Sequence, residues 1–384
     1  MKTVGLWLCA WSVCAAGAWA QSGIVKEKDV VIYSDDRFYA AFPSVVQRPD
    51  GELIVAFRRA PERRFLGESG SNHTDPNSYL VTVRSTDYGE TWTQEPELLF
   101  AHPFGGSQDP CMIQLHDGSI LCSSYGWVQL RENAIAKVPE TLRHGDFGFI
   151  GGYLLRSVDG GHHWTGPIIP PVVPGNETRT VLQEPCPAYN RGPMWEGKDK
   201  TLFWAVASQS RLEPRLTEVH LLASKDGGLT WEYRAPVAQD TKISFNETAL
   251  IETKQGDLVA FLRTEAFDDH TAVARSKDGG KSFGPWEDAG FQGHPHCATL
   301  LDDGRVLLVY GYRHAPHGIR ARILNADCTD IAQSQEVVLR DDGGNGDLGY
   351  PWVSRISNGK YLVTYYFNRE DGTRHIAGTV IAVQ

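Results

Sequence analysis

The phrase RSTDYGETW at residues 84–92 is repeated along the chain, and the repetition decides the fold. Related phrases are RSVDGGHHW at 156–164, SKDGGLTW at 224–231 and SKDGGKSF at 276–283, with a degenerate fifth copy, LNADCTD, at 323–329. We call each copy a box. Its serine and aspartate can bond backbone groups within a turn, its glycine can adopt a left-handed conformation, and its aromatic residue can cover the turn. The boxes therefore predict scaffold turns rather than chemistry.

A second repeat lies between the boxes and consists of a tight turn followed by an apolar or alternating strand. It occurs six times, at residues 48–57, 115–124, 197–206, 253–262, 301–310 and 356–365. Asp-Gly and Asn-Gly pairs provide the positive φ that two-residue hairpin turns require, and no segment shows a sustained helical period. Six such units predict an all-β fold, a six-bladed β-propeller of four-stranded antiparallel blades. We expect one propeller domain over residues 21–384.

The first twenty residues are typical of a segment that is removed after export. Lys2 gives a positive start, Val4 to Val13 is an apolar run, and Ala18 and Ala20 form a small-residue cleavage site. This pattern predicts a signal peptide over residues 1–20, cut after Ala20. We therefore expect a secreted or periplasmic protein, with no later stretch apolar enough to span a membrane.

Charge and cysteine content exclude some classes of partner. The chain has 37 Lys and Arg against 47 Asp and Glu, a net charge of −10. An acidic exported chain is a poor candidate for binding nucleic acid or an anionic membrane. The five cysteines after the signal are an odd number and show no CxxC spacing, so we expect no metal site. Of these, Cys111 and Cys122 flank a turn and could bridge a hairpin.

Repeated Ser-x-Asp-x-Gly-x-Thr-Trp boxes on a six-unit all-β chain resemble the Asp-box propellers of the sialidase (neuraminidase) superfamily, over essentially the whole chain after residue 20. The box is specific for the fold and weak for activity, since it also occurs in non-enzymatic propellers. The resemblance implies a retaining exo-glycosidase that acts on a glycan with a terminal acidic sugar, uses a tyrosine nucleophile and needs no cofactor. Its working residues would line one mouth of the ring, outside the boxes.

Two stretches match the sialidase pattern in spacing. In NETALIETKQGDLVAFLRTE (246–265), Glu247 opens one strand and Arg263 closes its partner. The resemblance implies that Glu247 polarises the nucleophile and that Arg263 binds a substrate carboxylate; a surface ion pair is the alternative. Tyr350 stands nine residues before Gly359, where the family has its nucleophile; a buried aromatic plug is the alternative. A phenol suits sialic acid, because the carboxylate on its anomeric carbon would repel an Asp or Glu nucleophile.

Two further regions supply candidates by position. The stretch YGYRHAPHGIRARIL (310–324) offers a second carboxylate-binding arginine, for which Arg313 is preferred because Arg320 and Arg322 alternate onto one face that we expect to be solvated. The loop before the first box is where the family's acid/base aspartate lies. Asp75 is one residue out of that register and His73 is close to it; either side chain can protonate a leaving oxygen, and Asp75 is preferred.

The chain departs from the sialidase pattern in the first unit. Sialidases have an arginine just before Ile-Pro, and Ala41 occupies that place here. Arg58 or Arg59 can substitute from the next strand, or the substrate is not sialic acid. His294 and Asp109 are additional candidates for substrate binding that do not belong to the usual sialidase set.

Three functions follow from these residues. The first is a secreted exo-glycosidase of sialidase type. The second is a lyase or hydrolase that cleaves a uronic-acid polysaccharide on the same propeller, which the missing arginine and the extra histidines favour. The third is a sugar-binding propeller without catalysis.

Overall fold

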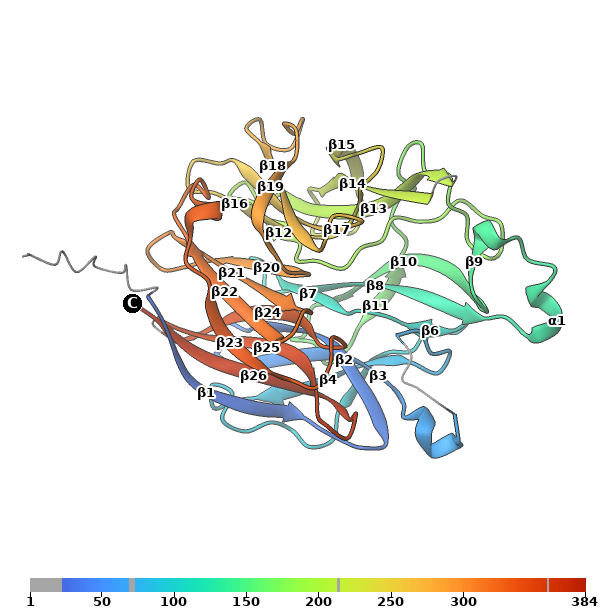
Figure 1. The fold of residues 1–384 in the computed structure, drawn as a ribbon, viewed down its shortest axis with the longest axis horizontal. Coiled ribbons are helices and arrows are strands. Elements are labelled where there is room, and N and C mark those ends of the chain that lie inside the picture. The colour runs from blue at the N-terminus through green and yellow to red at the C-terminus, as the bar shows by residue number, and fades with distance from the viewer. Residues whose placement is uncertain (1–22, 69–72, 213–214, 358) are drawn as a thin grey trace, which may run out of the picture.

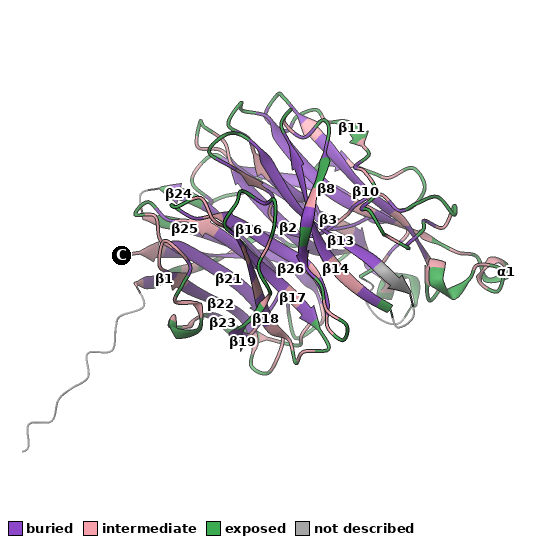
Figure 2. Ribbon diagram, turned by 90° about the horizontal axis from the view of Figure 1, so that it is seen from above, coloured by how far each residue is buried: buried purple, intermediate pink, exposed green. Residues whose placement is uncertain are grey.

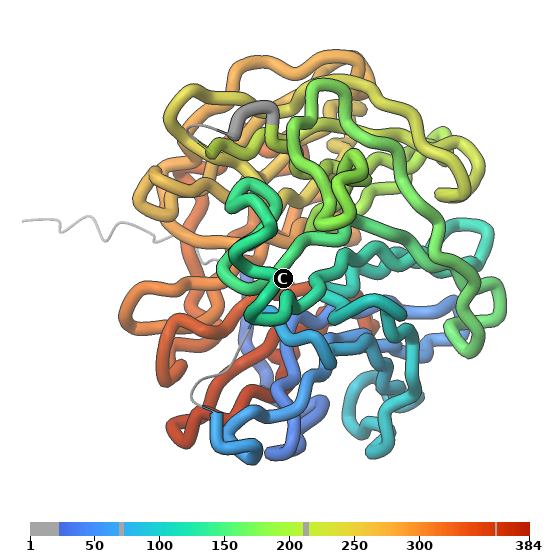
Figure 3. Tube along the Cα trace, turned by 90° about the vertical axis from the view of Figure 1, so that its right-hand side faces the viewer, coloured from blue at the N-terminus to red at the C-terminus, as the bar shows by residue number. Residues whose placement is uncertain are grey.

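The computed structural model describes residues 23–68, 73–212, 215–357 and 359–384. Within these residues the chain forms six antiparallel sheets, the blades, which follow one another around a central axis (Figures 1 and 3). The predicted all-β six-bladed propeller is confirmed. The predicted signal peptide, residues 1–20, lies outside the described residues.

Each blade is built from consecutive strands, with the first strand nearest the axis. From the inside outward, blade one consists of β2 (Phe38–Gln47), β3 (Leu53–Pro61), β4 (Tyr79–Ser85) and β5 (Glu97–Phe100), and blade two of β6 (Gly106–Ser107) with β7 (Cys111–Gln114), then β8 (Ile120–Gln129), β10 (Phe147–Ser157) and β11 (Thr165–Ile168). Blade three consists of β12 (Trp195–Glu196), β13 (Leu202–Leu212), β14 (Arg215–Ser224) and β15 (Glu232–Ala238), and blade four of β16 (Ser244–Glu252), β17 (Leu258–Glu265), β18 (His270–Ser276) and β19 (Glu287–Gln292). Blade five consists of β20 (His296–Leu300), β21 (Val306–Tyr312), β22 (His317–Leu324) and β23 (Val337–Gly343), and blade six of β24 (Gly349–Ser357), β25 (Lys360–Asn368), β26 (Arg374–Val383) and β1 (Ile24–Tyr33).

The sixth blade closes the ring by joining the two ends of the chain. Its outermost strand is β1, which runs antiparallel to β26 with Ile24 opposite Val383 and Tyr33 opposite Ile376 (Figure 1). A closed ring leaves fewer free strand edges than an open sheet.

The second blade departs from the others in two ways. Its innermost strand is divided into β6 and β7, which both pair with β8. The hairpin between β8 and β10 is extended and carries the short helix α1 (Glu132–Ile135), the 3₁₀ turn η2 (Glu140–Leu142) and β9 (Arg143–His144), which project from the ring in Figure 1. Two further 3₁₀ turns are η1 (Arg63–Leu66) and η3 (Ile331–Gln333). None of the helices among the described residues is long and apolar enough to cross a membrane.

The six predicted hairpin turns all join the innermost strand of a blade to the next strand, but in blades one to five the predicted two-residue turn type is wrong. In the first blade the Arg48 N–H donates to the Glu52 carbonyl at 2.8 Å, so three residues form the loop. Only Gly51 has a positive φ, of 92°. This is a type I turn followed by one left-handed residue. The same bond recurs in blades two to five, and in blade three Lys200 occupies the left-handed position with a φ of 65°.

The boxes join the third strand of a blade to the fourth, beside these hairpin turns. In the fourth blade the Ser276 hydroxyl donates to Asp278 at 2.8 Å and accepts from the Gly280 N–H at 2.9 Å. Asp278 in turn accepts from the Ser282 N–H and hydroxyl at 3.0 and 2.6 Å. These bonds hold the pKa of Asp278 down, at about 2. The box side chains are thus occupied within their own turns, as the sequence predicts for a scaffold element.

Replacement of Ser276 by alanine tests this structural role. The change removes the acceptor of the buried Gly280 N–H, and we expect the free energy of unfolding to fall by about 1–2 kcal/mol. We expect kcat/KM of the glycosidase activity that the sequence resemblance implies to stay unchanged, because the box lies at the end of the blade opposite to the candidate site. Urea unfolding and steady-state kinetics measure both, with the exposed neighbour Lys277→Ala as the control. A large loss of activity in Ser276→Ala at unchanged stability would contradict a purely structural box.

The core consists of the strands themselves, which are buried on both faces where neighbouring blades pack together (Figure 2). The exposed residues in Figure 2 gather in the connecting loops. The five cysteines of the described residues are buried and free, so the predicted bridge between Cys111 and Cys122 is wrong. Cys111 lies opposite Ser123, and Cys122, one residue away, points to the other face of the sheet.

Candidate functional site

The innermost strands bring one residue from each blade to the axis at a fixed distance along the chain from the hairpin turn. The last residue of each hairpin turn has a positive φ. The residues nine positions before it, in blades one to six, are Phe42, Asp109, Arg191, Glu247, Pro295 and Tyr350. Because the six blades are arranged around one axis, equivalent positions on their innermost strands converge. This end of the ring, which we call the mouth, is opposite the boxes.

The backbone is distorted at this level of the ring. The pairing register of the innermost strand shifts between Ala41 and Ser44 and between Phe245 and Thr248. Phe42, Asp109 and Tyr350 have positive φ values of 57°, 25° and 53°. Such conformations are costly for residues with side chains and gather at functional sites, where a bulge redirects a side chain.

Tyr350 and Glu247, from blades six and four, are in direct contact. The Tyr350 hydroxyl donates to Glu247 Oε1 at 2.6 Å. Arg263, from the strand after Glu247, donates through one Nη1 atom to Glu247 Oε2 at 2.7 Å and to the Tyr350 hydroxyl at 3.3 Å. The structure therefore brings together three residues that the sequence singled out, in a chain from phenol to carboxylate to guanidinium.

The charges of this group depend on one another. Burial opposes ionisation of Glu247, but Arg263 and the Tyr350 hydroxyl outweigh it, and the pKa of Glu247 is lowered. Burial, followed by the charge of Glu247, raises the pKa of Tyr350 well above its usual range. At neutral pH the pair is therefore a neutral phenol beside an ionised carboxylate that can accept its proton.

Two more guanidinium groups lie over the ring of Tyr350. Arg191 is 4.5 Å and Arg313 is 5.0 Å from the ring centroid. Arg191 is buried and donates to the Tyr350 carbonyl at 3.0 Å, and Arg313 donates to the Tyr366 hydroxyl at 3.3 Å. Cations at this distance from a phenol ring stabilise negative charge that develops on it.

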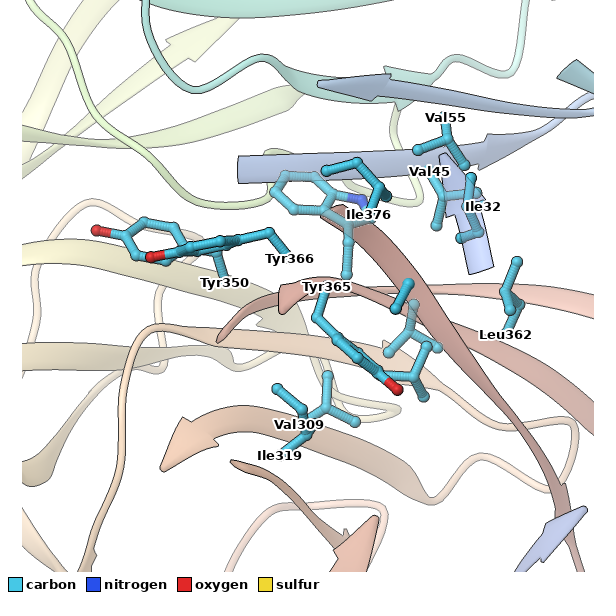
Figure 4. Close-up of a cluster of buried hydrophobic side chains, with 14 of the residues drawn as sticks. Ile32, Val45, Val55, Val309, Ile319, Tyr350, Leu362, Tyr365, Tyr366 and Ile376 are labelled. Atoms are coloured by element: carbon cyan, nitrogen blue, oxygen red, sulfur yellow. The ribbon is translucent and has the colours of Figure 1, made fainter. Parts of the chain in front are cut away.

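Ala41 is fully buried, and Tyr366 and Asp347 contact its neighbours on β2: the Tyr366 ring lies 5.1 Å from that of Phe42, and Asp347 accepts from the Tyr39 hydroxyl at 3.1 Å. The Tyr366 ring is 5.9 Å from that of Tyr350, and Figure 4 shows both rings side by side while Tyr365 points elsewhere. The Tyr366 hydroxyl donates to Asp347 at 2.9 Å. Arg313, which bonds the same Tyr366 hydroxyl, thus lies near the Asp347 carboxylate in this part of the mouth.

The two arginines proposed as substitutes lie on opposite faces of β3. Arg58 is fully buried, 5.9 Å from the ring centroid of Phe42, and faces the mouth among Asp75 and Asp109. Arg59 lies over Phe38 at 4.2 Å and donates to two tyrosine hydroxyls away from Tyr350. Alternation along a strand explains the difference, and only Arg58 is placed to reach the mouth.

Asp75 and His73 occupy different surroundings although they are two residues apart. Asp75 is 2% exposed and accepts two bonds from Arg63, at 2.6 and 2.8 Å. The His73 side chain is half exposed, with Nε2 at 3.3 Å from Asp347 Oδ1. Its ring stacks on Phe42 at 5.5 Å. Among the contacts that the described residues make, none joins Asp75 directly to Tyr350 or Glu247.

Asp109 is part of the same mouth and is buried beside Arg191. It accepts from the Tyr125 hydroxyl at 3.1 Å, while its second oxygen is buried without a hydrogen-bond donor among the described residues. Burial, with a smaller contribution from Glu247, raises the pKa of Asp109 to about 6.

His294 lies behind the arginines rather than in the open part of the mouth. It is buried, with Nε2 at 3.2 Å from Asp269, and burial followed by the charges of Arg263 and Arg313 lowers its pKa. We expect it to support the arginine loops rather than to bind substrate directly.

The expectation that Arg320 and Arg322 face solvent is wrong. Both are buried: Arg320 lies over Tyr312 of the same blade at 4.6 Å, and Arg322 lies over Phe291 of the fourth blade at 4.2 Å. Outer strands of a propeller blade are covered by the next blade, so their alternating faces are not free. Arg313 remains the arginine of this segment that reaches Tyr350.

A cavity of about 290 Å³ lies beside Glu247 at the mouth. Its walls include Tyr125, Trp127 and Tyr189 together with Arg191. Aromatic faces with a few polar groups are typical of sites that bind small polar molecules such as sugars. Among the described residues, no cluster of three or more His, Cys, Asp or Glu side chains is arranged to hold a metal ion.

Arg191, Phe42, Tyr366 and Asp347 belong to the site but do not follow from the sequence reasoning above. Arg191 has a signal in the sequence, since it lies nine residues before the turn residue Lys200, as Tyr350 does before Gly359. Asp347 and Tyr366 have none, because their roles depend on contacts between strands.

Comparison with known proteins places this geometry in a family. The BNR repeat-like domain family matches residues 143–363. A curated relative, a sialidase from Micromonospora viridifaciens, is 24% identical over 373 residues, which cover 89% of this chain and 52% of the relative. The chain thus spans about half the length of that protein.

Solved structures show the same fold. A protein of unknown function from Dyadobacter fermentans is 55% identical with a TM-score of 0.92, covering 94% of this chain and 100% of that one. The Hadza microbial sialidase Hz136 has 19% identity and a TM-score of 0.61, covering 89% and 65%. The NanB sialidase of Streptococcus pneumoniae, as its K499G mutant, has 13% identity and a TM-score of 0.64, covering 92% and 70%. The matched region exceeds half of the chain, and the protein belongs to the BNR repeat-like domain family with the six-bladed propeller fold of sialidases.

Proposed function

We propose that this protein is a secreted retaining glycosidase that releases a terminal acidic sugar from a glycan. The observation that carries the proposal is the 2.6 Å hydrogen bond from the Tyr350 hydroxyl to Glu247, with Arg263 bonded to both residues. A buried phenol paired with a carboxylate is an activated nucleophile. The sialidase-like fold and the distant sialidase relative support the same class of reaction.

The reaction proceeds through two displacements. In the first, Tyr350 Oη attacks the anomeric carbon, its proton passes to Glu247, and the glycosidic bond breaks as the leaving oxygen takes a proton from an acid at the mouth. In the second, water attacks the same carbon and gives a proton back to that acid. Tyr350 departs and recovers its proton from Glu247, so the two steps retain the anomeric configuration.

The arginines favour this reaction at two points. Arg191 and Arg313 lie over the ring of Tyr350, where they stabilise the phenolate character of the transition state. Arg263 and Arg313 border the open mouth and can bind a substrate carboxylate through their forked donors.

A uronic-acid polysaccharide is the second candidate substrate. Ala41 removes one arginine of the sialidase set, and Asp347 adds a negative charge near its place. With two arginines, Arg263 and Arg313, and with the Asp347 carboxylate near Ala41, the site is less suited to a sugar with a carboxylate on its anomeric carbon than to one with a carboxylate elsewhere on the ring.

Turnover by the purified protein tests the proposal. We expect it to release methylumbelliferone from a methylumbelliferyl sialoside or glucuronide, with retained configuration by NMR. Ultraviolet absorbance from an unsaturated product on a uronate polymer would instead identify a lyase. Absence of turnover on all three substrates, with binding of a glycan unaffected by Glu247→Gln, would indicate a sugar-binding propeller and reject the proposal.

A further inference from the structure

The proton donor of the proposed reaction is not assigned by the contact between Tyr350 and Glu247. A general acid needs a proton to give and must face the leaving oxygen at the open side of the site. Asp75, the residue that sequence position favours, meets neither condition. Both of its oxygens accept from Arg63, one of them also from the Asn77 N–H at 2.8 Å, and its side chain is buried. Both oxygens are thus occupied as acceptors by groups of the same loop.

His73 is better placed than Asp75, because an imidazole can give and take a proton near neutral pH and this one stands at the mouth. Its ring stacks on Phe42 at 5.5 Å, and Phe42 in turn contacts Tyr350 edge-on at 4.8 Å, so the histidine stands at the mouth on the same wall as the nucleophile. The His73 side chain is 55% exposed. The Gln108 side chain donates to the His73 carbonyl and holds the backbone in place. The exposed imidazole is thus separated from the Tyr350 ring only by the ring of Phe42.

Asp347 orients the imidazole. Its Oδ1 lies 3.3 Å from His73 Nε2, and the carboxylate is itself fixed by Tyr39, Tyr366 and Arg374, which donate to it at 2.9 to 3.2 Å. A carboxylate that binds one imidazole nitrogen fixes the ring and its tautomer, which leaves the other nitrogen, Nδ1, for proton transfer.

We propose that His73, oriented by Asp347, is the general acid and base of this site in place of Asp75. The inference rests on the proposed glycosidase function. In the first step Nδ1 of the protonated imidazole gives its proton to the leaving oxygen as the glycosidic bond breaks. In the second step the neutral imidazole takes a proton from the attacking water. His73 is then protonated again, and Asp347 keeps its charge throughout.

The charges around His73 give the reaction a defined pH dependence. Asp347 and Glu247 favour the protonated imidazole, whereas burial, the largest effect, and the cations Arg313 and Arg58 oppose it, so that the pKa of His73 lies below 6.5. The acid form is therefore lost as the pH rises through the lowered pKa of His73. We expect kcat/KM to fall at alkaline pH, as His73 loses its proton, and at acid pH, as Glu247 becomes protonated.

Comparison of leaving groups tests the assignment. Methylumbelliferone leaves with little help from a proton, whereas the sugar alcohol of sialyllactose needs one. For His73→Gln we expect a loss of about 10²–10⁴-fold in kcat/KM on sialyllactose and less than about 10-fold on the methylumbelliferyl sialoside. Azide should accelerate the variant on the latter substrate and form a glycosyl azide. If only glucuronides are turned over, methyl and methylumbelliferyl glucuronides replace this pair.

Matched variants separate the possible outcomes. Asp75→Asn should affect both substrates equally, and Asp347→Asn should move the alkaline limb of the wild-type profile to lower pH, since it removes a charge that raises the pKa of His73. Because His73 is half exposed, His73→Gln should fold, and thermal unfolding checks this. Equal losses on both substrates in His73→Gln, or the leaving-group dependence in Asp75→Asn, overturn the inference. A wild type that turns over none of these glycosides instead overturns the proposed function itself.

Discussion

Tyr350→Phe is expected to lower kcat/KM at least about 10³-fold, since removal of a nucleophile costs this much or more in enzymes with covalent intermediates. The change deletes one oxygen and keeps the ring, which still packs against Phe42 and Tyr366 at 4.8 and 5.9 Å. Glu247 keeps its bond to Arg263. We therefore expect the free energy of unfolding to change by about 1 kcal/mol only.

Tyr365→Phe is a matched control for this variant. Tyr365 is also fully buried and also uses its hydroxyl, which bonds Thr379 at 2.7 Å, but it points away from the mouth (Figure 4). It should lose similar stability and keep its activity. Kinetics on a methylumbelliferyl glycoside and urea unfolding provide both measurements. Activity of Tyr350→Phe within about 10-fold of the wild type would exclude the phenol as nucleophile.

Arg263→Met is expected to destabilise the protein by about 3 kcal/mol near pH 8, in addition to abolishing most activity. The change leaves the charge of Glu247 buried with its main partner removed, and loss of one member of a buried ion pair is costly. Methionine preserves most of the side-chain volume, so the loss reports the charge rather than a cavity.

The pH dependence of this variant should be opposite in sign to that of the wild type. In the wild type the pKa of Glu247 is below its ordinary value of 4.5, so its contribution to stability is present above that value and is lost as the pH falls through the folded pKa. Without Arg263, burial raises the pKa, and the contribution is lost as the pH rises through the raised value. Urea unfolding at about pH 5 and about pH 8 should show a larger loss at the higher pH.

A double variant isolates the pair. In a Glu247→Gln background the substitution Arg263→Met should cost less than about 1 kcal/mol, because the buried charge is no longer there. Equal costs in both backgrounds would show that Arg263 stabilises the fold through its packing and not through Glu247.

The ring could be predicted from the sequence because its signals are local. Each hairpin turn and each box is a phrase of about ten residues whose bonds close within itself, as those of Ser276 and Asp278 do. The length of the hairpin loop does not follow from the sequence, because an Asp-Gly pair fits both a two-residue turn and the three-residue loop seen at Gly51.

The site could be predicted only in part. Glu247, Arg263 and Tyr350 follow from spacing relative to a hairpin turn, and the same rule applied to every blade would have found Arg191. The pairing of Asp75 with Arg63 and of His73 with Asp347 could not be foreseen. The first pair forms within the connection between β3 and β4, and the second joins that connection to the segment before β24; neither contact is part of a repeated pattern.

Synthesis of the chain delivers β1 first and β26 last, yet these strands are neighbours in one sheet. The sheet that carries Tyr350 is therefore complete only once β26 has been synthesised. Pairing over so large a separation in sequence is slow, because the chain loses much conformational entropy before the contact forms. Tyr350, the proposed nucleophile, would reach its position among the final events of folding, after Glu247 and Arg263 from an earlier blade are already in place.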